Sequence, residues 1–123
     1  MTTTPDIGID LLEAQQQQPN VTHNEAILQI SAMLNGVIDM TTTAPPGSPT
    51  EGDAYVVASP ATGVWLGRED SVAFYTSGGW RFVPGDDSAG TPIVMGARQH
   101  GMRIYNRDDD TLYAWDGSAW VAL

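Results

Sequence analysis

The chain has 123 residues, and fifteen acidic side chains set against five arginines and no lysine give it a formal net charge of −10. The length fits a single domain, and a chain so poor in basic side chains is not expected to bind nucleic acid or anionic lipid. The lack of cysteine excludes a disulfide scaffold, a zinc ribbon and a thiol nucleophile. Since the sequence contains neither an apolar run of about 18 residues nor a signal peptide, we expect a soluble protein that is made in the cytoplasm and does not insert into membranes.

Residues 1–20 are predicted to form an extended arm. A short apolar patch precedes a glutamine run that Pro19 closes, and this segment has too little apolar surface to fold alone. It is either a loose terminus or an arm that orders against a partner chain. In the second interpretation, the anchoring side chains are Ile7, Ile9, Leu11 and Leu12.

Residues 21–40 are predicted to form one amphipathic helix. Thr22 and Glu25 have the spacing of a capping box at its start, and Gly36 weakens the last turn before an exit near Asp39. The apolar stripe is wider than one small sheet needs to cover. We therefore expect the helix to pack on its own domain and also against copies of itself. The residues predicted to mediate this oligomerisation are Ile27, Ile30, Met33, Leu34 and Val37.

A proline-rich linker is predicted over residues 41–50, because three prolines there disfavour regular structure. From residue 51 to 123 short apolar runs alternate with turns, which predicts a small antiparallel β domain and an α+β fold class. The expected strands cover residues 54–58, 64–66, 72–75, 80–83, 93–95, 102–105, 112–115 and 120–122.

A repeat with an offset of 40 residues is visible in this β domain. Residues 72–75 correspond to 112–115, and Asp70 corresponds to Asp110. In each half, an aromatic residue lies five positions before a tryptophan, across a turn rich in glycine and serine. This spacing predicts a hairpin with an aromatic pair at its foot, stabilised by cross-strand stacking. We expect a small antiparallel sheet made of two related hairpin units.

The sequence contains no GxSxG, Walker or HExxH motif, and His23 and His100 stand apart from any patterned partner. We therefore predict that the protein is not an enzyme, and we assign no catalytic or cofactor-binding residue.

One acidic segment invites a test for a metal site. Asn106, Asp108 and Asp110 are spaced like the first ligands of an EF-hand, but Thr111 replaces the required glycine and Gly117 replaces the final glutamate. A solvated hairpin turn is favoured over a calcium site of low affinity, and we predict no bound metal.

Tryptophans are the remaining signal, and all four lie in the β domain. Aromatic rings can stack on sugars, so a glycan-binding platform is one interpretation. The favoured interpretation is that they form the core of a small sheet or contacts between subunits. These tryptophans are Trp65, Trp80, Trp115 and Trp120.

Several motifs keep their order and spacing over about 100 residues. They are VTHNEA at 21–26, APP at 44–46, SP at 48–49, EGDAYVV at 51–57, ATGVWLG at 61–67, GWRF at 79–82 and WDGSAW at 115–120. With these motifs the chain resembles a domain-of-unknown-function family found in tail-fibre and head-spike proteins of tailed bacteriophages, prophages and gene transfer agents.

This resemblance implies a non-enzymatic structural component of a phage or phage-like virion, forming a homotrimer and attaching through its arm to other tail or capsid proteins. Members of the family commonly continue into a long fibre, whereas this sequence stops at Leu123, directly after the second tryptophan turn. We therefore expect a short fibre, a spike base or a tail/capsid adaptor, made in the bacterial cytoplasm and located in the virion. The alternative is a module that binds host surface polysaccharide through exposed tryptophans.

Overall fold

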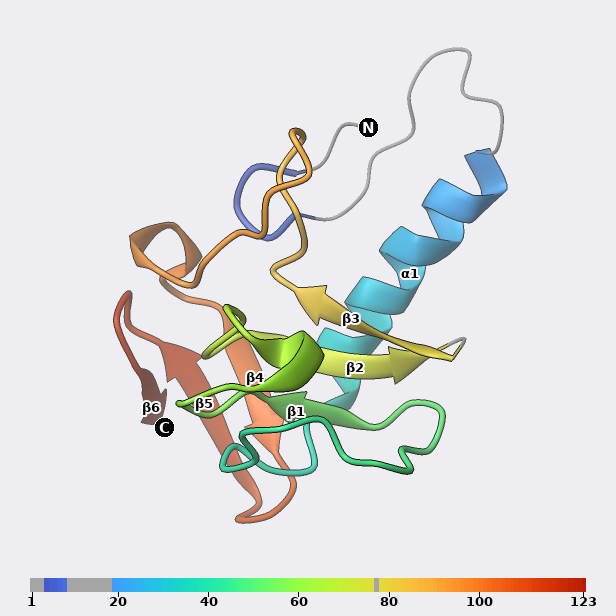
Figure 1. Ribbon diagram of the computed structural model, residues 1–123. Coiled ribbons are helices and arrows are strands. Elements are labelled where there is room, and N and C mark those ends of the chain that lie inside the picture. The colour runs from blue at the N-terminus through green and yellow to red at the C-terminus, as the bar shows by residue number, and fades with distance from the viewer. Residues whose placement is uncertain (1–3, 9–18, 77) are drawn as a thin grey trace.

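The computed structural model describes residues 4–8, 19–76 and 78–123, in which one α-helix packs against two three-stranded antiparallel sheets (Figure 1). The α+β class is as predicted, but the β domain contains two separate sheets where one was expected. The helix and the strands of the first sheet are α1 (Pro19–Asn35), β1 (Ala54–Val56), β2 (Val72–Thr76) and β3 (Gly79–Val83). The second sheet contains β4 (Arg103–Asn106), β5 (Thr111–Trp115) and β6 (Trp120–Ala122).

Helix α1 begins at Pro19, a residue whose fixed φ suits a first helical turn. The predicted capping residue Thr22 therefore lies inside the helix, and its side chain and that of Glu25 are outside the described residues. The helix ends at Asn35, about one turn before the predicted exit. Gly36 follows with a φ of +84°, and a Cβ there would lie only 2.8 Å from the carbonyl oxygen of Tyr105. A glycine in left-handed conformation is a common helix terminator, and here no larger residue fits.

Val37 is the one predicted oligomerisation residue that lies beyond the helix, and this prediction is wrong. Its side chain is fully buried, and its backbone forms a parallel bridge with Asn106 at the edge of β4. The next residue, Ile38, donates its amide to the carbonyl oxygen of Ala54 in β1 at 2.7 Å. The chain leaving α1 thus joins the second sheet and then the first, which places both sheets against the same helix.

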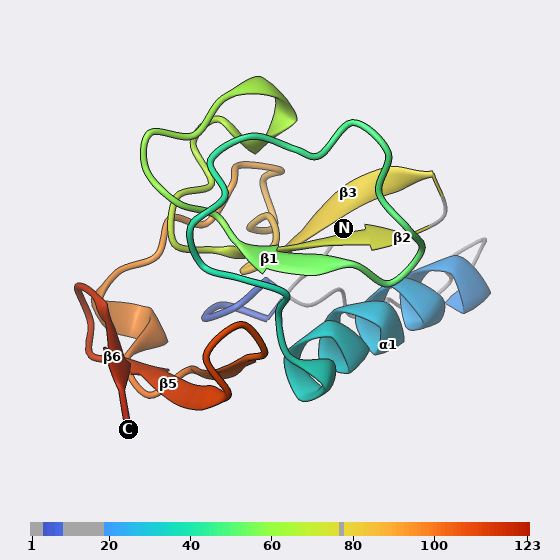
Figure 2. The ribbon, with the colours of Figure 1, turned by 90° about the horizontal axis from the view of Figure 1, so that it is seen from below.

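The first sheet is covered on both faces. Ala54 pairs with Phe74 and Val56 with Val72, so these side chains share one face, where they pack in a core that includes Ala32 of α1. The opposite face carries Tyr55 and other residues that pack against the segment between β1 and β2. In Figure 2, α1 runs along one side of β1–β3, and that segment, in light green, lies on the other side. The residues buried in this second cluster are Tyr55, Val57, Ala61, Trp65 and Ala73.

Two predicted strands are absent from the described sheets. Residues 64–66 were expected to be extended, but Gly63–Trp65 form a 3₁₀ turn that opens with Gly63 at a φ of +65°. The turn places the Trp65 ring in the core, 5.7 Å from the ring of Tyr55. Residues 93–95 also form no strand, and a 3₁₀ turn, Ala97–Gln99, follows them. A run of three apolar residues fits a strand or a buried turn equally well, so local pattern could not decide between them.

Both predicted aromatic pairs are confirmed. Tyr75 and Trp80 are partners across the β2–β3 hairpin, with ring centroids 5.3 Å apart. Trp115 and Trp120 are partners across the β5–β6 hairpin, with centroids 5.5 Å apart. In each pair the rings meet edge to face, which is a favourable geometry for aromatic contacts.

Candidate functional site

One face of α1 exposes large apolar side chains to solvent. Ile27, Ile30 and Leu34 are 51%, 45% and 83% exposed, and their spacing of three and four residues places them in one row. We call this row the helix face. It borders a hollow of about 350 Å³ whose lining also includes Ser31 and Asn35. No residue between 26 and 35 is charged. Exposed apolar rows of this kind are typical of surfaces that bind another protein.

The opposite side of α1 packs on the protein's own core. Ala32 is buried there, and Leu28 and Met33 are half-buried against the same cluster. Of the predicted oligomerisation residues, Ile27, Ile30 and Leu34 are therefore free to contact a second molecule, while Met33 is largely engaged within the chain.

The predicted anchoring arm is described only in part. Ile7 is half-buried against the core of its own chain, so it is not a free anchor. Ile9, Leu11 and Leu12 lie outside the described residues.

The four tryptophans do not form an exposed platform. Trp65 and Trp115 are buried, with 0% and 2% of their surface exposed. Trp80 is half-buried and meets the Trp65 ring edge to face at 5.2 Å. Trp120 is half-buried, and its indole nitrogen donates to the Asp70 carbonyl oxygen at 2.9 Å, which ties the second sheet to the first. The burial of two rings excludes a four-tryptophan glycan platform and agrees with the core interpretation.

The second sheet exposes an apolar surface that sequence reasoning missed. Tyr105 pairs with Leu112, and Val121 pairs with Ala114, so these side chains share one face of the sheet. Leu123 extends the same face, because its amide donates to the Leu112 carbonyl oxygen at 2.9 Å. We call Tyr105, Leu112, Val121 and Leu123 the outer sheet face; they are 40–72% exposed. The sequence did contain a signal for this surface. Apolar residues stand at every second position of these strands, and the sheet is covered by the rest of the protein on its other face only.

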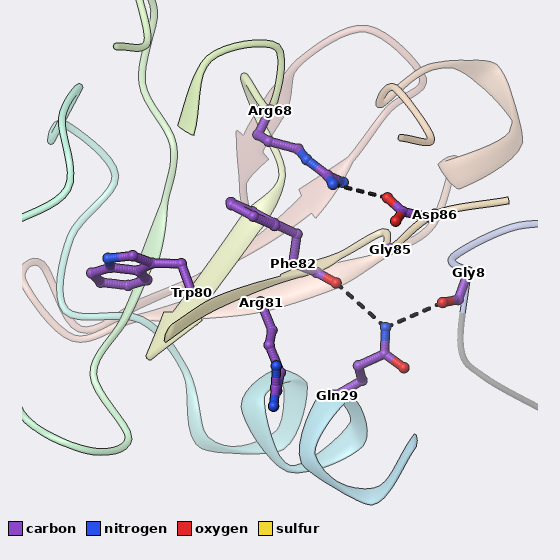
Figure 3. A pocket seen from close by; sticks show the side chains of 8 residues that line it. All are labelled: Gly8, Gln29, Arg68, Trp80, Arg81, Phe82, Gly85 and Asp86. Carbon is purple, nitrogen blue, oxygen red and sulfur yellow. Dashed lines mark hydrogen bonds and ion pairs between the residues drawn. The ribbon is translucent and has the colours of Figure 1, made fainter. Parts of the chain in front are cut away.

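A polar hollow of about 250 Å³ lies where β3, α1 and the segment Thr4–Gly8 meet (Figure 3). The Arg68 guanidinium stacks on the Phe82 ring at 4.3 Å from its centroid and forms a 2.9 Å ion pair with Asp86. The Gln29 side-chain amide donates to the carbonyl oxygens of Phe82 and Gly8, at 3.4 and 3.1 Å. These groups hold together the segment before β2, β3 with the residues after it, α1 and residues 4–8, and Asp86 offsets the positive charge of Arg68.

The acidic turn between β4 and β5 uses its carboxylates within the hairpin. The Tyr113 hydroxyl donates to Asp109, and the Tyr105 hydroxyl donates to Asp110 at 3.2 Å. The hydrogen bond to Asp109 is the main reason why the pKa of Tyr113 is raised, whereas desolvation is the main reason why the pKa of Tyr105 is raised. In the described part of the chain, no three acidic or histidine side chains are grouped so that they could hold a metal ion.

Within residues 4–8, 19–76 and 78–123, no helix is both long enough and apolar enough to cross a bilayer.

Comparison with known proteins gives one match. The family described as "Protein of unknown function (DUF2793)" matches residues 23–121, which is more than half of the chain. The matched region includes the helix face, the first sheet and all of the second sheet except Ala122 at the end of β6. Neither the curated proteins nor the solved structures contain a match to this chain.

Proposed function

The chain belongs to this family of proteins of unknown function, and we propose that it is a non-enzymatic structural component of a phage or phage-like virion that assembles through its helix face. A short fibre, a spike base or a tail/capsid adaptor fits this role. The virion context is supported by the sequence resemblance described above. The observation that carries the proposed assembly is the exposed row of Ile27, Ile30 and Leu34 on the uncharged part of α1.

The proposed assembly is a homotrimer in which three copies bring their helix faces together around a three-fold axis. Transfer of apolar surface from water contributes about 25 cal/mol per Å², and Leu34, which is 83% exposed, has the most to gain. Because no charged group interrupts residues 26–35, close packing of these helices requires no burial of an unpaired charge.

We also propose that the β domain consists of two related units. Support comes from positions 40 residues apart. Asp70 and Asp110 both adopt left-handed conformations, with φ of 69° and 52°. Each precedes the first strand of an aromatic hairpin. Left-handed φ is uncommon outside glycine, and aspartate is among the residues that tolerate it.

Contacts with other tail or capsid proteins are proposed for surfaces that self-association leaves open. The outer sheet face is one such surface, because it exposes apolar side chains, with the charged side chains of Arg103, Asp110 and Asp116 near its borders. Anchoring through Ile9, Leu11 and Leu12 remains a prediction.

Light scattering of the purified protein tests the assembly. We expect about three times the monomer mass of 13.2 kDa at micromolar concentration. Leu34→Lys should yield folded monomers, because a lysine near a helix C-terminus suits the helix dipole while opposing an apolar interface. Leu66→Lys is the matched control, since Leu66 is 72% exposed and far from α1 in sequence. A wild-type monomer, or equal effects of both variants, would contradict the proposal.

Incorporation into particles tests the virion context. The protein should be detected in phage-like particles purified from the strain that encodes it, and Leu34→Lys should reduce its amount while Leu66→Lys does not. Absence of the wild-type chain from such particles would refute the virion role, whatever its oligomeric state.

A further inference from the structure

The second sheet ends in an edge that the rest of the described chain leaves unpaired. In Figures 1 and 2, β6 lies at the margin of the molecule, as the last strand in the order β4-β5-β6. The edges of the other outer strands have contacts. Val37 donates its amide to the carbonyl oxygen of Tyr105 in β4, and Ile38 donates to that of Ala54 in β1. The Gln29 side chain donates to a carbonyl oxygen of β3. Within residues 4–8, 19–76 and 78–123, the outer edge of β6 has no such contact.

The backbone groups at this edge follow from the pairing of β6 with β5. The Leu123 amide donates to the carbonyl oxygen of Leu112 at 2.9 Å. Between antiparallel strands, hydrogen-bonded pairs of residues alternate with pairs that are not hydrogen-bonded. Val121 therefore directs its N–H and C=O groups toward β5, as Leu123 does. Trp120 and Ala122 direct theirs away from the sheet, where they are free to pair with an added strand.

The edge of β6 lacks the usual protection against a further strand. Free edges are commonly blocked by charged side chains, proline or a bulge, whereas β6 reads Trp-Val-Ala and contains neither a charge nor a proline. The apolar side chains beside it are open as well, since Val121 and Leu123 are 45% and 72% exposed. An edge with outward N–H and C=O groups at alternate residues matches an extended backbone, and no other shape satisfies those groups as fully.

A hollow of about 500 Å³ lies beside this edge on the outer sheet face. Arg103, Ala114 and Val121 pair across the three strands and share this face, so the small side chain of Ala114 leaves space between the other two. Arg103 is exposed and forms no ion pair within the described part of the chain. His100 and Asp116 also line the hollow, but the Asp116 carboxylate accepts hydrogen bonds from two amides of its own turn. The charge of Arg103 therefore favours an acidic group on whatever binds here.

We propose that the edge of β6 and this hollow form a docking site for an extended strand of a different protein, which pairs with β6 and directs an acidic side chain toward Arg103. This inference rests on the partner contacts proposed for the outer sheet face, and it names their chemistry. A second copy fits less well. The free edge that it offers is its own β6, and residues 117–123 contain no acidic side chain to face Arg103. Hydrogen bonds between main chains supply affinity in such sites, and side-chain pockets supply specificity.

Amide hydrogen exchange of the full chain, followed by NMR, tests the site directly. In the free protein, the amides of Val121 and Leu123 should exchange slowly and those of Trp120 and Ala122 rapidly. The probes are three matched hexapeptides in which threonine and valine alternate and one central residue is glutamate, glutamine or lysine. At saturation, the glutamate peptide should slow exchange at Trp120 and Ala122 by about tenfold, and it should bind about tenfold more tightly than the lysine peptide.

Two variants test the backbone and the charge separately. Ala122→Pro removes an outward N–H group that β5 does not use, so it should abolish binding of the glutamate peptide while the Val121 amide still exchanges slowly. Arg103→Gln should abolish the preference for glutamate over lysine. Arg107→Gln is its matched control, since Arg107 is exposed but does not line the hollow. Loss of the preference in both arginine variants would overturn the role assigned to Arg103.

The outcomes separate this inference from the proposed function. Rapid exchange at Trp120 and Ala122 with all three peptides would overturn the docking site. Protection that rises with protein concentration in the absence of peptide would overturn the different partner, because a second copy would then occupy the edge. Light scattering of the same samples measures self-association. A trimer that binds no peptide refutes the docking site alone, whereas a monomer that binds the glutamate peptide supports the docking site and contradicts the trimer.

Discussion

The two sheets carry the same aromatic pair across their hairpins but differ in what covers them. All residues of β1 in the first sheet are buried, because α1 packs on one face and the segment between β1 and β2, which contains Trp65, packs on the other. In the second sheet, β4 alternates between exposed and buried residues. Ile104 faces the shared core, while Tyr105 beside it is 40% exposed.

This difference shows that the sequence spacing within a hairpin does not determine which other parts of the chain pack against it. Tyr75 and Trp80 join the rings of Tyr55 and Trp65, whereas Trp115 and Trp120 contact each other as a single pair among the described aromatic contacts. The first sheet is thus committed on both faces to the protein's own stability. The second keeps one apolar face available for a partner.

The largest expected effect comes from removing the cover of the first sheet. Trp65→Ala should lower the free energy of unfolding by about 3–5 kcal/mol, because it leaves a cavity where a fully buried ring packs. Leu66→Ala, at the neighbouring exposed position, should change it by less than about 0.5 kcal/mol. Urea denaturation measures the free energy of unfolding of both variants. If Trp65→Ala and Leu66→Ala lost similar amounts, the distinction between the buried and the exposed position would be wrong.

A smaller effect distinguishes the two faces of the second sheet. Ile104→Ala should cost about 2–5 kcal/mol, since its side chain is 1% exposed. Leu112→Ala, at a position that is 41% exposed, should cost less than about 0.5 kcal/mol. The measurement is the urea midpoint at low protein concentration. A large loss for Leu112→Ala would mean that the outer sheet face is covered in solution.

The smallest effect concerns pH, and the two sheets differ in its sign. Desolvation, with a further contribution from the charge of Glu69, raises the pKa of Asp70 above its usual value of 3.8. The folded state therefore favours the protonated carboxyl, and the stability that Asp70 contributes is lost as pH rises through its folded pKa. Asp70→Asn should be more stable than wild type near neutral pH, since asparagine tolerates a φ of 69°. The difference should shrink as pH falls through the folded pKa of Asp70, and it should be smallest below 3.8.

Asp116 in the β5–β6 turn provides the opposite case. Hydrogen bonds from the amides of Ser118 and Ala119 lower its pKa, so its contribution to stability is present above 3.8 and lost as pH falls through the folded pKa. Asp116→Ala should be less stable than wild type at neutral pH and should approach it in acid. Unfolding curves between pH 3 and 7 test both, and parallel pH profiles for Asp70→Asn and Asp116→Ala would contradict the assigned causes.

Sequence reasoning located α1 and both aromatic hairpins, and it failed where the chain turns into the core. The spacing of Tyr75 from Trp80 is local, so hairpin geometry alone determines that they meet. The run at 64–66 looked like a strand, yet Trp65 is buried only because a 3₁₀ turn directs it toward Tyr55. The contacts of residues 6–8 with Gln29, Gly85 and Gln99 were missed because these three residues are far apart in the sequence.

By itself, the sequence determined the α+β class, the helix and the two cross-strand aromatic pairs, because these depend on periodicity and on turns of a few residues. Tertiary structure alone decided that Val37 is buried while Leu34 is exposed, and that the β domain divides into two sheets. Burial follows from contacts such as that between Trp120 and Asp70, which are 50 residues apart. Local pattern does not encode which distant segments meet, and so it could not say which apolar side chains remain free to bind a partner.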